Sequence, residues 1–173
     1  MGEGWIEMPR MTLPARLLSR AEIAYARTVF GDSLDYTVVR ITVDSLWSWR
    51  SARTLGNTIH LWYSHFEDGD GTRELTRFAG LPTLIHELTH VWQFQKRGYW
   101  YLFSSLWGQV RHMRDRARAY DWQGALEVGK PWGRWTAEQQ AQAVQDSLGV
   151  LPGSPRSLSL YRILHEAFRG RMG

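Results

Sequence analysis

Two kinds of hydrophobic pattern alternate along the chain, and they predict which segments are helices and which are strands. Apolar residues recur every three or four positions, as on one face of a helix, in residues 13–30, 82–97, 103–120, 136–148 and 158–168. Residues 36–43 and 57–63 are rich in β-branched side chains and alternate as strands do. We therefore predict a helix-rich α+β fold with a small β-sheet early in the chain.

Residues that favour helix ends set the expected boundaries. Thr12 can cap the first helix, and Gly31 follows its last residue. Gly98 can close the helix that begins near Pro82. The tetrapeptide 136–139, Thr-Ala-Glu-Gln, matches a capping box and predicts a helix start. A loop rich in glycine and tryptophan is expected just before it, in residues 124–135.

Length and composition predict one globular domain, residues 1–173. Apolar residues make up 43% of the chain and charged residues 22%, which is typical of a globular protein. No apolar run approaches the roughly 18 residues that span a bilayer. The first residues contain Glu3 and lack the hydrophobic core of a signal peptide. We expect a cytoplasmic protein, or one exported through a secretion system without a cleaved signal.

The chain contains no cysteine, so nitrogen and oxygen donors alone can hold a metal ion. Its six histidines are His60, His65, His86, His90, His112 and His165.

Residues 86–90, His-Glu-Leu-Thr-His, form an H-E-x-x-H motif inside a predicted helix. Residues four apart lie about one turn above each other, so His86 and His90 can bind the same ion. Glu87 lies to their side, where it can activate a zinc-bound water. Histidines on an apolar helix can also be ordinary core residues, but two of them beside a glutamate are costly to bury without partners. The motif therefore predicts Zn²⁺ as cofactor and Glu87 as catalytic base.

A catalytic zinc site needs a third protein ligand. Gln93 and Lys96 stand where the metzincin extension requires glycine and histidine, which excludes that class. Glu138, in the first turn of the helix after residue 136, is our candidate, although glutamate is favoured there by the helix dipole alone. Gln142 and Asp146 lie on the same face and can orient a ligand. Three residues remain as alternative third ligands: Asp146, Glu127 and His165.

Residues 54–59, 84–93 and 138–141, together with Asp146, resemble a set of bacterial zincin-like proteins. These proteins are encoded near Rhs and Vgr components of type VI secretion and are related to the core-domain family of extracellular contractile injection systems. The resemblance covers about residues 40–148. It implies a gluzincin-like metallopeptidase fold with His86 and His90 as ligands, Glu87 as base and Glu138 as third ligand. Gln142 departs from the family pattern, which has glutamate there.

The predicted function is that of a zinc metalloendopeptidase acting on a peptide or protein and associated with Vgr or Rhs components. The strand at 57–63 is expected to align the substrate by strand addition. The oxyanion requires a further donor. The candidates are Tyr120, His112, Arg111 and His165.

Two other functions compete with the metallopeptidase. An adaptor protein of the secretion apparatus would use a surface of Trp100, Trp107, Trp132 and Trp135, with the zinc structural. Nucleic-acid binding would use the arginines of residues 111–118. These arginines point in several directions on a helix, and no nucleic-acid motif accompanies them, so we expect no nucleic-acid partner.

Overall fold

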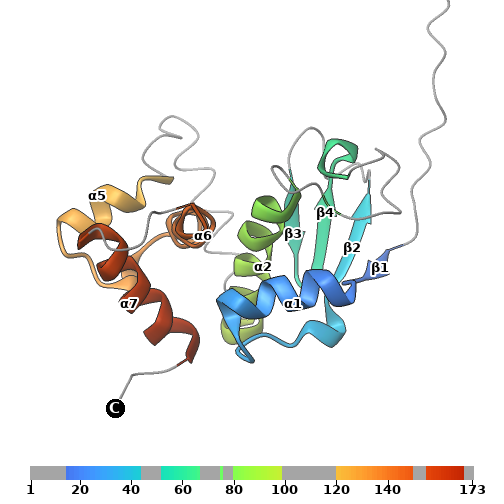
Figure 1. Ribbon diagram of the computed structural model, residues 1–173, viewed down its shortest axis with the longest axis horizontal. Coiled ribbons are helices and arrows are strands. Elements are labelled where there is room, and N and C mark those ends of the chain that lie inside the picture. Colours follow the sequence, from blue (N-terminus) through green and yellow to red (C-terminus); the bar gives the residue numbers. More distant parts are fainter. Residues whose placement is uncertain are drawn as a thin grey trace, which may run out of the picture.

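The computed structural model describes residues 15–43, 52–66, 75, 80–98, 120–149 and 155–169 (Figure 1). Its strands are β1 (Arg16–Leu17), β2 (Arg40–Val43), β3 (Arg53–Leu55) and β4 (Thr58–Leu61). Its α-helices are α1 (Arg20–Phe30), α2 (Gly80–Arg97), α5 (Trp122–Glu127), α6 (Ala137–Ser147) and α7 (Pro155–Arg169). Short 3₁₀ helices are η1 (Tyr36–Val38), η2 (Tyr63–His65) and η3 (Trp132–Arg134). The predicted helix-rich α+β class is confirmed.

The four strands form one mixed sheet in the order β1-β2-β4-β3. β2 and β4 are parallel, and the outer strands β1 and β3 are antiparallel to their neighbours. The strand predicted at 57–63 is confirmed as β4, whereas β3, its hairpin partner, was not predicted. The strand predicted at 36–43 is only half correct, because Asp35 accepts a hydrogen bond from the Thr37 amide and winds residues 36–38 into η1.

Helix α1 begins later than the predicted residue 13. Ser19 and Glu22 form a capping box that starts the helix at Arg20. The residues before it join the sheet as β1, and the Arg16 guanidinium binds the buried Glu22 carboxylate at 2.7 Å. The predicted end is correct, with Gly31 in a left-handed conformation of φ 56°. A nearby cap and a strand pairing thus override the helical pattern of residues 15–18.

Helix α2 lies between the sheet and the group of α5, α6 and α7 (Figure 1). The predicted helix 82–97 is confirmed, with its start moved to Gly80. A side chain at Gly80 would overlap the His65 carbonyl oxygen, so this close approach requires glycine. Helix α2 has neighbours on both sides: Leu84, Ile85 and Leu88 are buried in the core, while His86, His90 and Gln93 contact α6.

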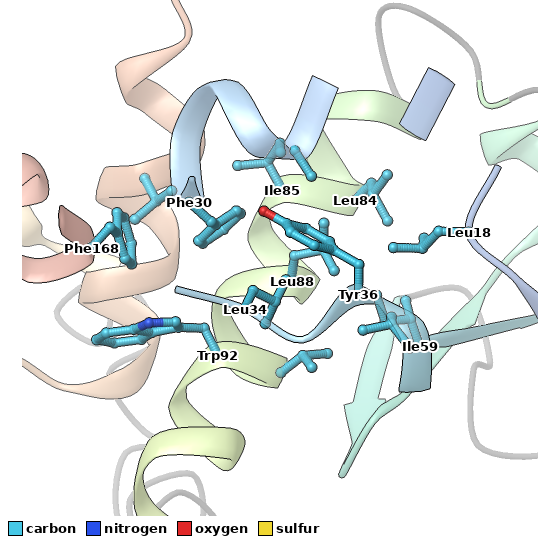
Figure 2. Packing of buried hydrophobic residues seen from close by; sticks show 14 of the residues in the cluster. Leu18, Phe30, Leu34, Tyr36, Ile59, Leu84, Ile85, Leu88, Trp92 and Phe168 are labelled. Carbon is cyan, nitrogen blue, oxygen red and sulfur yellow. The ribbon is translucent and has the colours of Figure 1, made fainter. Parts of the chain in front are cut away.

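The main hydrophobic core fills the space between α1, α2 and the sheet. Figure 2 shows Leu84 and Leu88 of α2 gathered with Phe30 and Tyr36. Phe168 of α7 extends this core with edge-on ring contacts at centroid distances of 4.9 Å. Its two partners are Phe30 and Trp92. Aromatic packing of this kind fixes α7 against both α1 and α2.

The segment expected to be a loop, residues 124–135, is partly helical. Asp121 caps α5 through the Gly124 amide, so the helix runs through Glu127. Trp135 is buried and donates its indole N–H to the Lys130 carbonyl at 2.7 Å. Trp132 is half-buried beside it, with ring centroids 5.2 Å apart. Trp135 therefore belongs to the core, which contradicts its predicted role in an exposed adaptor surface, whereas Trp132 packs against the core and stays partly exposed.

Several predictions lie outside the described residues. They concern the helix predicted at 103–120, of which only Tyr120 is described, the arginines of 111–118, and Trp100 and Trp107. Within the described ranges, no helix has both the length and the apolar character needed to cross a membrane. Helix α6 matches its prediction, since Thr136 and Gln139 form the expected capping box.

Replacing Thr136 with alanine removes the hydroxyl that accepts from the Gln139 amide, and with it half of the α6 capping box. We expect the free energy of unfolding to fall by about 0.5–2 kcal/mol. Urea denaturation followed by circular dichroism measures the loss. The control is Thr28→Ala. Thr28 is exposed on α1, so we expect this change to alter the free energy of unfolding by less than about 0.5 kcal/mol. Equal effects of the two changes would contradict the capping role.

Candidate metal centre

Two histidines project from neighbouring turns of α2 toward α6. The rings of His86 and His90 are 5.1 Å apart between centroids and inclined at 73°. Their side chains are 12% and 13% exposed, so each is largely removed from water. The arrangement follows from the four-residue spacing predicted from sequence, and it directs Nε2 of both rings to one place.

Glu138 reaches the same place from the first turn of α6. Its Oε2 atom lies 3.4 Å from Nε2 of His86 and 3.6 Å from Nε2 of His90. One ligand atom from each residue lies within 4.8 Å of the other two. The structure thus brings together the three residues predicted as ligands, although His90 and Glu138 are 48 positions apart along the chain.

The electrostatics of the group favour a cation. Burial raises the pKa of Glu138, but hydrogen bonds from His86 and His90 and their charge outweigh it and hold the pKa far below its usual range. Burial likewise lowers the pKa of His90, yet Glu138, helped by the charge of Glu87 and by Gln93, raises it to about 9. Positive charge is therefore stabilised between these side chains, and the raised pKa of His90 shows that a proton on this ring can provide it. Two imidazoles and a carboxylate are also a donor set that fits Zn²⁺.

Glu87, the predicted base, lies on α2 between the two histidines and is buried. The Thr54 hydroxyl of β3 donates to its Oε2 atom at 2.7 Å. This bond restrains the carboxylate, and the charge of Glu87 also acts on His90. Thr54 was not predicted as a site residue, because only the sheet pairing shows that β3 passes beside α2.

Gln93 and Gln140 form a second set of contacts that was not predicted. Gln93 bonds His90 Nδ1 at 2.9 Å through its side-chain oxygen and donates to Gln140 Oε1 at 2.7 Å. Both glutamines are almost completely buried. The spacing of three residues between His90 and Gln93 places them on one helix face, a signal that the sequence does contain.

The alternative third ligands lie elsewhere. Asp146 accepts hydrogen bonds from Trp122 Nε1 at 2.8 Å and from Gln142 Nε2 at 2.7 Å. Asp146 and Gln142 therefore bond each other, and no described contact joins them to a ligand histidine, contrary to the role predicted for them. Among the residues that the structure describes, neither Glu127 nor His165 belongs to the metal-ligating group.

The candidates for oxyanion stabilisation stay predictions. Tyr120 is exposed before α5, and His165 stacks loosely with Tyr161 of its own helix at 6.1 Å. His112 and Arg111 lie outside the described residues.

The strand predicted to bind substrate cannot do so by strand addition. β4 is bonded to β2 on one side and β3 on the other, so neither of its edges is open. In the described part of the chain β3 has a single partner strand and is the sheet edge nearer the site.

Comparison with known proteins yields one partial similarity. No family model matches the chain, and no solved structure matches it. The chain is 32% identical, over 133 residues, to the type VI secretion system spike protein VgrG2b of Pseudomonas aeruginosa. The similarity covers 76% of this chain and 13% of that protein. The chain therefore corresponds to a small part of the spike protein.

Replacing Thr54 with valine leaves the buried Glu87 carboxylate without its hydroxyl donor. We expect the free energy of unfolding to fall by about 1–3 kcal/mol, the cost of an unsatisfied buried polar group. Chemical denaturation measures it. Thr58→Val is the control, because Thr58 lies in the same hairpin with its side chain on the opposite sheet face. Stability unchanged by Thr54→Val would contradict the described contact.

Proposed function

We propose that this protein is a zinc-dependent metalloendopeptidase of zincin type. The observation that carries the proposal is the convergence of His86, His90 and Glu138 from two helices, with Glu87 buried beside them. A gluzincin site has the same division, with two histidines and the base on one helix and a glutamate on a later one. The edge strand beside the motif helix supports the same fold type.

His86, His90 and Glu138 would hold the zinc ion. When bound, zinc lowers the pKa of a water molecule and polarises a carbonyl group. Three protein ligands leave one coordination position for these two tasks, as catalytic rather than structural zinc requires. The low pKa of Glu138 keeps this ligand ionised at neutral pH.

Glu87 would serve as the general base. One of its oxygens accepts the Thr54 hydrogen bond, which leaves the second oxygen to take a proton from the attacking water. The same carboxylate can then deliver that proton to the leaving amine. Its burial removes competing bulk water, which strengthens the interaction with the reacting groups.

The substrate would be an extended peptide segment lying along β3. An edge strand offers unpaired backbone groups to which a peptide can add. β3 runs from Arg53 to Leu55, and its middle residue touches Glu87, so an added strand would pass the base. This replaces the strand at 57–63 as the proposed docking element.

The similarity to a spike protein supports an association with type VI secretion. We infer that the chain acts as an effector-like domain whose partners are Vgr or Rhs components, and that export follows that route.

Zinc content tests the three ligands. We expect about one zinc per wild-type chain, purified without chelator, and its loss from His86→Ala and Glu138→Ala, because each removes one of three ligands. Elemental mass spectrometry measures it. Asp146→Ala and Glu127→Ala should keep the metal and serve as controls. Zinc retained by Glu138→Ala and lost from a control would assign the third ligand elsewhere.

Glu87→Gln keeps the size of the side chain but removes the base. We expect zinc content to stay and cleavage of labelled casein to fall by about 10²–10⁴-fold. Glu127→Gln, an exposed glutamate on α5, is the matched control and should cleave normally. A Glu87→Gln variant with full activity would refute the mechanism. A wild type that binds zinc but cleaves nothing would favour the adaptor function.

A further inference from the structure

A chain of hydrogen bonds through two buried amides leads from His90 to the backbone of η3. His90 Nδ1 lies 2.9 Å from Gln93 Oε1. Gln93 Nε2 donates to Gln140 Oε1 at 2.7 Å and to the Ala137 carbonyl at 3.2 Å. Gln140 Nε2 donates to the Trp132 carbonyl at 2.8 Å.

Two backbone carbonyls fix the direction of this chain. An amide side chain can be turned to exchange its oxygen and nitrogen, so its orientation must follow from its partners. The carbonyl of Trp132 can only accept, so Gln140 must present its NH₂ group there and its oxygen to Gln93. The carbonyl of Ala137 imposes the same choice on Gln93. The oxygen of Gln93 is then left for His90, whose Nδ1 must donate.

We propose that Gln93, oriented by Gln140, is a positioning residue that keeps the proton of His90 on Nδ1 and directs Nε2 toward Glu138. The proposal rests on the metal site proposed above and concerns how its ligand is prepared. A ligand histidine bound through one nitrogen usually has its other N–H held in this way. Here the holder is a neutral amide that reaches across the interface between two helices.

The same chain couples the two parts of the site. Gln93 lies on α2 with His90, and its Nε2 bonds the carbonyl of Ala137, the residue before Glu138. One side chain therefore sets both the ring of His90 and the start of α6. His86 differs, because its buried Nδ1 has no hydrogen-bond partner among the described residues. A hydrogen bond at Nδ1 therefore restrains the ring of His90, whereas the ring of His86 lacks this restraint among the described residues.

A purely structural role for the glutamines is the competing explanation. It predicts that replacing them weakens the α2–α6 interface without a specific effect on His90. The two explanations are separated by a signal from the His90 ring itself. A double variant separates them as well. Replacing Gln93 alone leaves the buried Gln140 side chain without its partner, whereas replacing both glutamines by leucine removes that unsatisfied group.

The first experiment uses metal-free protein labelled with ¹⁵N in histidine. Long-range ¹H–¹⁵N correlation spectra should show a proton on Nδ1 of His90 in slow exchange with water. Gln93→Leu should abolish this slow exchange, and Gln95→Leu, a glutamine on α2 that bonds Asn57 and Asp35 instead, should preserve it. Absence of the wild-type signal, or its persistence in Gln93→Leu, overturns the proposal.

The second experiment measures zinc affinity by competition with a chromophoric chelator. We expect Gln93→Leu and the double variant Gln93→Leu/Gln140→Leu to bind zinc about 10- to 100-fold more weakly. Gln95→Leu and Gln142→Leu should stay within about twofold of wild type. A folded double variant with wild-type affinity overturns the proposal. If the wild type binds no zinc, the proposed peptidase fails, and the spectra of the metal-free protein still decide whether Gln93 holds the His90 proton.

Discussion

The packing of α2 against α6 is the contact on which the rest of the site depends. Helix α2 packs against the sheet and α6, and its contacts with α6 include two histidines and a glutamine, His86, His90 and Gln93. Buried polar groups must be satisfied, and here Gln93 and Gln140 bond each other while His86 and His90 face Glu138. A shift of one helix along the other would break these bonds together. The interface therefore has one favourable register, and that register brings the three candidate ligands into one group.

Charge gives this interface its chemical character. Two carboxylates, Glu87 and Glu138, lie near two imidazoles in a region with little access to water. Such a group is unfavourable without positive charge, since buried like charges repel and are poorly solvated. In the metal-free protein the imidazolium of His90 supplies it, as its pKa of about 9 indicates. A divalent ion between the same atoms would neutralise the site more completely, because the ion would interact with His86, His90 and Glu138 at once.

The sheet contributes by placing a hairpin along α2. Gly56 turns the chain with φ 63°, a conformation that glycine adopts without strain, and Phe94 of α2 packs beneath this turn. The hairpin brings Thr54 to Glu87 and leaves β3 as an edge among the described strands. The hairpin therefore both restrains Glu87 and leaves an edge to which an extended peptide could add.

Local signals in the sequence determined the helix that carries His86, Glu87 and His90, and the capped start of α6 before Glu138. Both depend on spacing within a single helix, where side-chain positions follow from the backbone repeat. The same kind of signal misplaced the start of α1, because Thr12 was chosen as the cap, whereas Ser19 and Glu22 form the capping box and Arg16 pairs with Ile41 of β2. Tertiary structure alone decided that β4 is internal, that Thr54 holds Glu87, and that Gln93 meets Gln140. Each of these contacts joins residues at least 33 positions apart or depends on which strands are neighbours, and no local pattern encodes such pairings.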